Sequence, residues 1–184
     1  MTSRAKKETI DKQTEKVLKS LKGRRVGVFV DDANLYHAYK NYGWRVDWGK
    51  FRKFISKYCE LQFIKYFVAV PKKEDPSYKG TRSFLKNIKP NVTIETKPLK
   101  YIKLGAKLVK KGDVDVEITL SVVENLDTLD CVLLVSGDSD YLRLKGYTRA
   151  AGKEIVFVGY ESNMAWEIRQ LGHVYLNRIK PFIA

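Results

Sequence analysis

The sequence is short of the residues that build soft-metal sites and disulfide frameworks. Its 184 residues include two cysteines and two histidines. Cys59 and Cys131 each lie inside an apolar stretch, which favours reduced core thiols over a disulfide bridge. Because His37 and His173 are far apart and no Cys cluster occurs, we expect no zinc site. Any metal chemistry must therefore use oxygen ligands.

Long hydrophobic runs are also missing. No segment approaches the roughly 20 consecutive apolar residues that a membrane-spanning helix needs. Residues 1–22 are charged throughout and contain no apolar segment of a signal peptide. We therefore expect no membrane association and a cytoplasmic location. A length of 184 residues suffices for one domain with a real core, or for one domain plus a tail.

The sequence has an excess of positive charge. The 35 Lys and Arg against 21 Asp and Glu give a formal net charge of +14, while the 44% of hydrophobic residues is ordinary for a globular protein. This balance predicts a polyanionic partner. Residues 97–111 carry six lysines and no acid, and residues 113–130 carry six acids and no base. Two solvated faces of neighbouring elements would also explain these adjacent runs.

Short apolar runs alternate with segments of helical period, which predicts a mostly parallel sheet with helices on both faces. The strands are predicted at 26–30, 62–70, 92–96, 131–135, 154–158 and 174–176. The helices are predicted from about 33 and at 47–57, 78–89, 113–125, 141–151 and 163–171. The predicted fold class is α/β, a three-layer α/β/α architecture with a Rossmann-like sheet. Residues 1–22 are predicted to be a basic N-terminal extension, with at most a short helix of thin apolar face, and residues 23–184 the domain.

Acidic residues follow the two strongest predicted strands. Asp31, Asp32 and Asn34 follow the first, and Asp138 and Asp140 follow the strand at 131–135. In open α/β sheets the ligand crevice lies outside the carboxyl ends of the strands. Neighbouring carboxylates repel unless a cation shares them, and Mg2+ and Mn2+ prefer such ligands. Helix N-capping explains either group alone, but four acids exceed the one per helix that capping needs.

A third acidic position is Asp115, in the first turn of the helix predicted at 113–125. The helix dipole favours a carboxylate there, and the side chain can lean toward the same edge of the sheet. The surrounding residues lack the glycine turn and the later Glu of a calcium-binding EF-hand, which excludes that reading.

These motifs together resemble the NYN domain of the PIN-like nuclease superfamily. The resemblance covers about residues 24–178. It rests on four motifs in this order: a hydrophobic strand followed by Asp31-x-x-Asn34, the segment Lys111-Gly112-Asp113-Val114-Asp115-Val116, the segment Ser136-Gly137-Asp138-Ser139-Asp140-Tyr141, and Gly152-Lys153 before a strand. It implies a Rossmann-like fold in which an Asp cluster binds Mg2+ or Mn2+ for RNA hydrolysis. By position it implies Asp31, Asp115, Asp138 and Asp140 as metal ligands and catalytic residues, with Asn34 holding a ligand or the substrate.

The sequence departs from the family pattern at two positions. Ser121 stands where members often have another acid, so the number of metal ions is left open. Asp32 stands where glycine is frequent, and this carboxylate could supply or crowd a ligand.

The expected function is a metal-dependent ribonuclease, in which the ion lowers the pKa of a water and neutralises charge on the phosphate. We expect basic residues beside the acids to bind the nucleic acid backbone; the candidates are Lys100, Lys103, Lys107, Lys110, Lys111 and Arg82. Aromatic residues after the first strand could stack on bases, although core packing is their more common role; these are Tyr36, Tyr39, Tyr42 and Trp44. Single-stranded or structured RNA is the first choice of partner, and DNA is an alternative.

Two other functions stay open. A phosphatase with Asp31 as nucleophile fits a residue that follows a strand, but the Asp-x-Asp spacing is missing and the net charge favours a polymeric substrate. A non-catalytic RNA-binding module would result if Ser121 abolished efficient metal binding. A Ser/His/Asp triad is not supported, because neither histidine lies near a nucleophile motif. The oligomeric state is not predicted.

Overall fold

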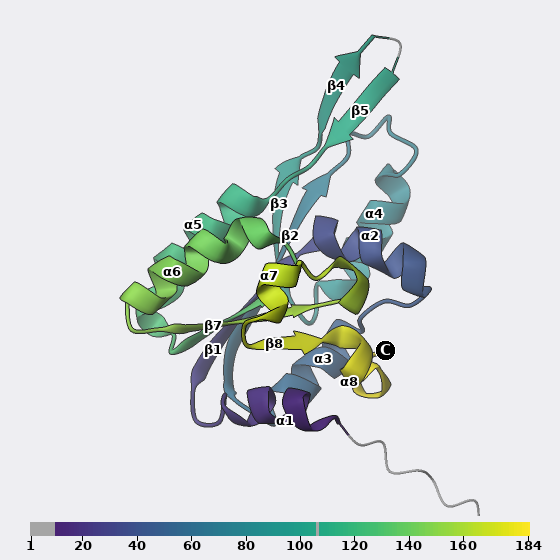
Figure 1. The fold of residues 1–184 in the computed structure, drawn as a ribbon. Coiled ribbons are helices and arrows are strands. Elements are labelled where there is room, and N and C mark those ends of the chain that lie inside the picture. The colour runs from purple at the N-terminus through teal and green to yellow at the C-terminus, as the bar shows by residue number, and fades with distance from the viewer. Residues whose placement is uncertain (1–9, 106) are drawn as a thin grey trace, which may run out of the picture.

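The computed structural model describes residues 10–105 and 107–184. Its main sheet (Figure 1) has six parallel strands. Their order is β3-β2-β1-β6-β7-β8. In sequence order these strands are β1 (Arg25–Asp31), β2 (Glu60–Val70), β3 (Thr93–Pro98), β6 (Cys131–Val135), β7 (Glu154–Gly159) and β8 (His173–Tyr175). Successive strands are added on one side of β1 and, from β6 onward, on the other. The space between β1 and β6 is therefore the topological switch point, where ligands bind in such sheets.

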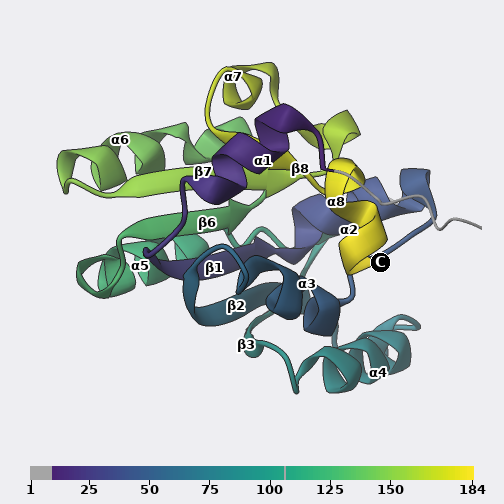
Figure 2. The ribbon, with the colours of Figure 1, turned by 90° about the horizontal axis from the view of Figure 1, so that it is seen from below.

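Helices cover both faces of the sheet, as Figure 2 shows. One face packs against α1 (Lys12–Lys19), α2 (Asp32–Tyr42), α3 (Trp48–Ile55), α4 (Tyr78–Ile88) and α8 (Leu176–Ile183). The other packs against α5 (Asp115–Asn125), α6 (Leu142–Ala150) and α7 (Trp166–Arg169). Three short 3-10 helices, η1 (Leu126–Thr128), η2 (Ser139–Tyr141) and η3 (Glu161–Asn163), lie between these elements. The predicted three-layer α/β/α fold is confirmed.

The segment before β1 contributes to the core. The described part of the predicted N-terminal extension begins at residue 10, and residues 1–9 lie outside the described residues. Leu18 and Leu21 are buried in the same cluster as the side chains of α3 and α8. Asp11 caps α1 by accepting a hydrogen bond from the backbone nitrogen of Thr14 at 3.0 Å. The boundary at residue 22 stays a prediction, with core residues on its N-terminal side.

The basic run at 97–111 forms an antiparallel hairpin that the sequence did not predict. Its strands are β4 (Lys100–Leu104) and β5 (Lys107–Lys111). Gly105 lies between them with φ of 59°, a left-handed conformation that glycine adopts without steric cost. Figure 1 shows the hairpin projecting beyond the main sheet. Five of the six lysines of this run therefore lie on an arm, and Lys97 belongs to β3.

Two C-terminal elements also differ from the sequence prediction. The helix predicted at 163–171 is shortened to α7, because residues 164 and 165 are extended and the backbone nitrogen of Ala165 donates to Gly137 O at 2.8 Å. Helix α8 was not predicted. It buries Leu176, Ile179 and Ile183 on one face. No helix within residues 10–105 and 107–184 is both long and apolar enough to cross a membrane.

Candidate functional site

Asp31 occupies the switch point of the sheet. It ends β1 next to the end of β6, because Val30 is paired with Val135. Its side chain is buried, and its two oxygens have different partners. Oδ1 accepts a hydrogen bond from the backbone nitrogen of Asn34 at 3.2 Å and so caps α2, while Oδ2 accepts one from Ser136 Oγ at 3.1 Å. Capping therefore accounts for one oxygen, and the other faces the neighbouring strand.

The Tyr141 hydroxyl group joins Asp31 to Asp115. It donates to Asp115 Oδ1 at 3.0 Å and lies 3.5 Å from Asp31 Oδ2. The ring is buried in the core between the sheet and α5, so its position is fixed by packing. Burial and the two carboxylates hold the pKa of Tyr141 far above its usual value, which keeps the hydroxyl a donor. The first turn of α5 thus brings Asp115 to the end of β1.

Asp138 and Asp140 lie at the outer side of this edge. Asp138 caps η2 through Oδ1, which accepts from the backbone nitrogen of Asp140 at 3.0 Å, and its own backbone nitrogen donates to Ser136 Oγ at 3.2 Å. Asp138 is half-buried and Asp140 is exposed. Both are close enough to Asp115 to raise the pKa of its carboxyl group. The structure therefore brings all four predicted acids to one edge, with Asp31 and Asp115 as the inner pair.

The inner carboxylates carry charge that no ion pair within the described residues compensates. Burial raises the pKa of Asp31 to about 6, against the hydrogen bonds from Asn34 and Ser136 that lower it; repulsion by Asp115 and Asp32 raises it further. Burial, followed by repulsion from neighbouring carboxylates, raises the pKa of Asp115. In the part of the chain that the structure describes, none of the four acids forms an ion pair. This is the condition in which a hard cation relieves repulsion.

The side chains as they stand do not form a multidentate cage. Within the described residues, no group of three or more His, Cys, Asp or Glu side chains could hold a metal ion. Mg2+, however, is usually bound through one or two carboxylates and several waters. Asp31 and Asp115, which face the same hydroxyl group, suit that kind of binding. The donor set therefore fits one hard cation held largely through water.

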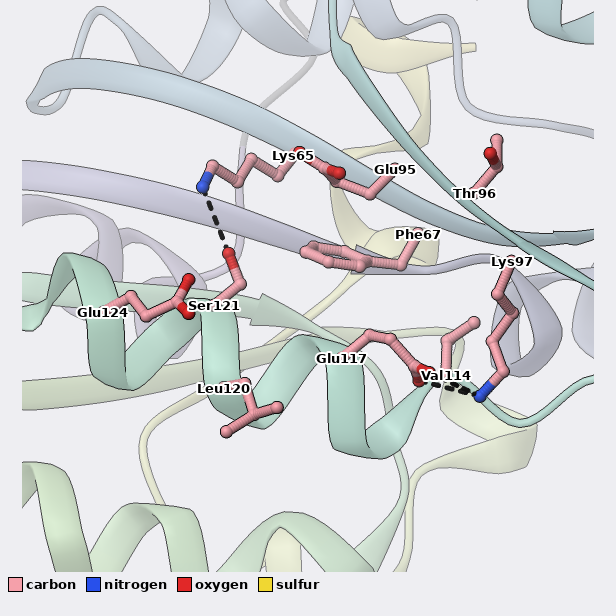
Figure 3. A pocket seen from close by; sticks show the side chains of 10 residues that line it. All are labelled: Lys65, Phe67, Glu95, Thr96, Lys97, Val114, Glu117, Leu120, Ser121 and Glu124. Carbon is pink, nitrogen blue, oxygen red and sulfur yellow. Dashed lines mark hydrogen bonds and ion pairs between the residues drawn. The ribbon is translucent and has the colours of Figure 1, made fainter.

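Ser121 adds no ligand to this pair. It is buried on α5, and its Oγ accepts a hydrogen bond from Lys65 Nζ at 3.1 Å (Figure 3). An ammonium group therefore faces the position where family members often have an acid. Asp32 also faces elsewhere, because it accepts a hydrogen bond from Tyr66, whose ring belongs to the core on the α2 and α3 side. Burial raises the pKa of Asp32.

Asn34 holds three loops together. Its Oδ1 accepts from the backbone nitrogen of Gly137 at 3.0 Å and from Asn163 Nδ2 at 2.8 Å, and Asn163 Nδ2 also donates to Asn34 O at 2.8 Å. The segments after β1, β6 and β7 are therefore linked through one side chain. Sequence reasoning placed Asn34 at the site but missed Asn163, which is 129 positions away and lies in no motif.

Gly137 is required by the same junction. A Cβ atom at this position would meet the carbonyl oxygen of Asn163 and would lie 2.8 Å from Met164 Cα. The loops border an open hollow of about 350 Å3 lined by Asn34, Gly137, Asp138, Ser139, Ser162, Asn163, Met164 and Ala165. Asn163 Oδ1 is buried there, without a hydrogen-bond partner among the described residues.

The predicted nucleic-acid-binding residues fall into two groups. Lys110 Nζ forms an ion pair with Asp75 at 2.8 Å, and Lys111 Nζ forms one with Asp113 at 3.1 Å. The other candidates form no ion pair within the described residues; they are Lys100, Lys103 and Lys107 on the hairpin and Arg82 on α4. All six side chains are exposed. Two of the five hairpin lysines are thus already engaged.

The aromatic residues after β1 mostly pack against the protein. Tyr42 stacks on Tyr160 at 5.3 Å between ring centroids, and Trp44 meets the same ring edge-on at 5.0 Å. Tyr39 is half-buried beneath Arg45. Tyr36 is exposed. Core packing therefore accounts for Tyr42 and Trp44, and Tyr36 is the member of this set best placed to meet a base.

Comparisons with known proteins establish the family and the fold. Residues 25–177 match the family model of the NYN domain. The chain is 26% identical over 164 residues to the low amplitude and bright protein LabA of Synechococcus elongatus. The aligned region covers 86% of this chain and 87% of LabA. A crystal structure of a Vibrio parahaemolyticus protein of unknown function has the same fold, with a TM-score of 0.68, 23% identity, and coverage of 88% of this chain and 97% of that one. Because the family model spans most of the sequence, the chain belongs to the NYN domain family.

Proposed function

We propose that the protein is a ribonuclease that hydrolyses RNA phosphodiester bonds with Mg2+ or Mn2+ held at Asp31 and Asp115. The observation that supports this most directly is the uncompensated pair of carboxylates at the switch point in a chain whose formal net charge is +14. An edge that attracts cations, within a protein that attracts polyanions, suits metal-assisted cleavage of a phosphate chain.

Each residue of the site has a separate part in this proposal. Asp31 and Asp115 hold the ion, and the Tyr141 hydroxyl group orients both carboxylates. Asp138 and Asp140 act from the outer side through water. When bound, the ion supplies Lewis acidity that generates a nucleophilic water at neutral pH and offsets charge on the phosphate. Asn34 keeps the loop of Asp138 in place through Gly137 and Asn163.

The exposed basic residues are proposed to bind the RNA backbone. Lys100, Lys103, Lys107 and Arg82 are the first candidates, and Lys110 and Lys111 contribute less because they are engaged with Asp75 and Asp113. Such contacts make affinity fall as salt concentration rises. Exposed Tyr36 offers a ring for an unpaired base. RNA is preferred to DNA on the strength of the family, and the cytoplasmic location expected from the sequence stays a prediction.

The decisive experiment is cleavage of an end-labelled RNA in Mg2+, in Mn2+ and in EDTA. Asp31→Asn should reduce metal-dependent cleavage by about a hundredfold or more while RNA binding is retained. Asp127→Asn is the matched control, because Asp127 is an exposed acid of η1 outside the site. Identical purification of all three proteins tests for a contaminating nuclease. Equal cleavage by the wild type and Asp31→Asn would refute the proposal.

A second candidate is a non-catalytic RNA-binding module. The Lys65 ammonium group beside Ser121 and the lack of a preformed cage of three or more ligands among the described residues favour it. RNA binding without cleavage in either metal would support this function and contradict the first.

A further inference from the structure

Two exposed apolar surfaces lie outside the candidate site. Within the described residues, most of the large apolar side chains that are exposed belong to the hairpin and to α5. On the hairpin, Leu104 and Leu108 are 61% and 59% exposed; on α5, Val116 and Leu120 are 66% and 56% exposed. Contiguous patches of this kind mark interaction sites. The apolar side chains of these surfaces have no part in the proposed catalysis, whereas the hairpin lysines are also candidates for RNA binding.

The hairpin surface combines apolar and basic side chains. Opposed residues of an antiparallel pair lie on the same face. The pairs Lys100–Lys111, Ile102–Val109 and Leu104–Lys107 therefore give one face three apolar residues and three lysines. Leu108 lies on the opposite face, opposed to Lys103. The whole ribbon carries five lysines and no acid among its strand residues. It is therefore an apolar arm with a strong positive charge.

The α5 surface combines apolar and acidic side chains. Val116, Leu120 and Val123 are spaced at i, i+4 and i+7, so they form one stripe along the helix. Beside the stripe lies a groove of about 250 Å3 between α5 and strands β2 and β3, with Leu120 at its margin and Phe67 and Val114 in its lining (Figure 3).

Three glutamates border that groove. Glu117 forms an ion pair with Lys97 at 2.8 Å, whereas Glu95 and Glu124 are exposed and form no ion pair within the described residues. The same groove is lined by Lys65 and Lys97, and Lys97 neutralises Glu117. The α5 surface, defined as the stripe together with Glu95, Glu117 and Glu124, therefore matches the hairpin in apolarity and opposes its charge through Glu95 and Glu124.

The hairpin and the α5 surface approach one another only near the base of the hairpin in the described residues, where Lys97 and, to a smaller extent, Lys100 lower the pKa of Glu117. The base of the hairpin is anchored by Asp75, which is buried and accepts hydrogen bonds from the Tyr101 hydroxyl group at 2.8 Å and from Lys110 Nζ at 3.0 Å. Figure 1 shows the hairpin extending away from the body, while α5 runs in a different direction from the same junction. The hairpin is therefore presented to a partner instead of folding back.

We propose that two copies of this chain form a two-fold dimer in which the hairpin of each packs on the α5 surface of the other. In a two-fold contact, a surface of the first copy meets a different surface of the second, and the reverse contact forms at the same time. One two-fold rotation can thus place the hairpin of each copy on the α5 surface of the other. The apolar face of the arm covers the stripe, and arm lysines meet the glutamates beside the groove. Reciprocal exchange forms the contact twice.

RNA alone does not account for these features. Phosphate contacts use the lysines but leave Leu104, Leu108 and the α5 stripe exposed. The carboxylates of Glu95 and Glu124 also repel a polyanion. A basic, apolar protein segment suits that surface, and the hairpin of a second copy supplies one.

The first test is sedimentation equilibrium on the whole chain. The wild type should dimerise, and Leu104→Ser on the arm or Leu120→Ser on α5 should each raise the dimer dissociation constant by about tenfold or more. Tyr147→Ser is the matched control, because Tyr147 is an exposed apolar residue of α6 outside both surfaces. The proposal would be overturned if the wild-type protein stayed monomeric at about 100 µM, a concentration at which even a dimer with a weak dissociation constant would be populated. Dimerisation that neither surface variant affects would overturn it as well.

The second test distinguishes hairpin exchange from other dimers. In a mixture of Leu104→Ser and Leu120→Ser, the mixed dimer regains one intact contact, made by the normal arm of the second variant and the normal α5 of the first. The other contact carries both substitutions, but because the two residues lie in one contact, their combined cost is smaller than the sum of the separate costs. The mixture should therefore associate more tightly than either variant alone. A mixture no tighter than the stronger of the two variants would point to a symmetric contact of α5 with α5, or of arm with arm, and would overturn the exchange.

Discussion

Replacing Asp31 by Asn should stabilise the metal-free protein at neutral pH. The substitution removes the negative charge but keeps an Oδ1 atom that can accept from the backbone nitrogen of Asn34, so α2 retains its cap. The new amide group is also placed beside the hydroxyl groups of Ser136 and Tyr141, both of which can accept a hydrogen bond.

The magnitude follows from the raised pKa. Asp31 ionises with a pKa of about 6 in the folded protein, against 3.8 for the unperturbed group. At pH 7 this difference costs the folded state about 3 kcal/mol. At pH values well below 3.8 both states carry the proton and the cost vanishes; it grows as the pH rises to about 6 and is constant above. Because a buried amide has its own desolvation cost, we expect a net gain of about 1–2 kcal/mol.

The assay is urea unfolding in EDTA at neutral and acidic pH. Asp31→Asn should be more stable than the wild type at pH 7, and the gain should largely disappear near pH 4. Asp127→Asn, which removes an exposed charge, should change stability at neither pH. Mg2+ should narrow the difference, because it stabilises the protein that retains the carboxylate. A variant that is less stable than the wild type at pH 7, or a gain of equal size at pH 4, would refute the reasoning.

Three further predictions concern the surroundings of the site. Gly137→Ala should destabilise the protein by about 1–3 kcal/mol in urea unfolding, because the new Cβ would meet the backbone of Asn163 and Met164. Gly146→Ala is the control, because a Cβ atom at this position of helix α6 meets nothing within 4 Å; it should be neutral or stabilising by up to about 1 kcal/mol. Equal effects of the two substitutions would argue against a close approach at Gly137. Tyr141→Phe should lower the free energy of unfolding by about 1–2 kcal/mol in the same assay, because Asp115 loses its hydrogen-bond donor. NMR titration of this variant should show a still higher pKa for Asp115. An unchanged pKa would mean that the hydroxyl group of Tyr141 does not act on Asp115. Asp75→Asn should speed hydrogen exchange in β4 and β5, whereas Asp113→Asn, which removes only an exposed pair with Lys111, should not. Lys110, Ser77 and Tyr101 hold the pKa of Asp75 well below its ordinary value. Wild-type hairpin protection should therefore be present at neutral pH, begin to weaken below about pH 4, and be lost only as the pH falls through the lower pKa of the folded protein. Protection that is independent of pH would contradict this.

The acids at the sheet edge could be predicted because two simple regularities coincide. Parallel strands end at the same edge, and Asp31 and Asp138 follow the two most apolar runs in the chain. Asp115 was placed by the helix that begins there. These inferences need only local sequence, since hydrophobic periodicity and strand ends are local properties.

The contacts that orient those acids could not be predicted in the same way. The role of Tyr141 depends on a hydroxyl group meeting Asp115, 26 positions earlier, whereas in the sequence it reads as a core aromatic. Asp75 anchors Tyr101 and Lys110 across 26 and 35 positions. The hairpin itself was missed because a strand of alternating lysine and apolar residues, exposed on both faces, leaves no clean signal of burial.

The central position of β1 has a consequence for biosynthesis. Among the described strands β1 comes first in the sequence, and it pairs with β6, whose residues follow about a hundred positions later. At ribosomal rates of about 5–20 residues per second, one edge of β1 waits about 5–20 s for its partner. An apolar strand with an open edge invites aggregation during that interval. Nascent chains stopped before residue 135 should accordingly depend on chaperones, and full-length chains should gain protease resistance only after β6 has left the ribosome.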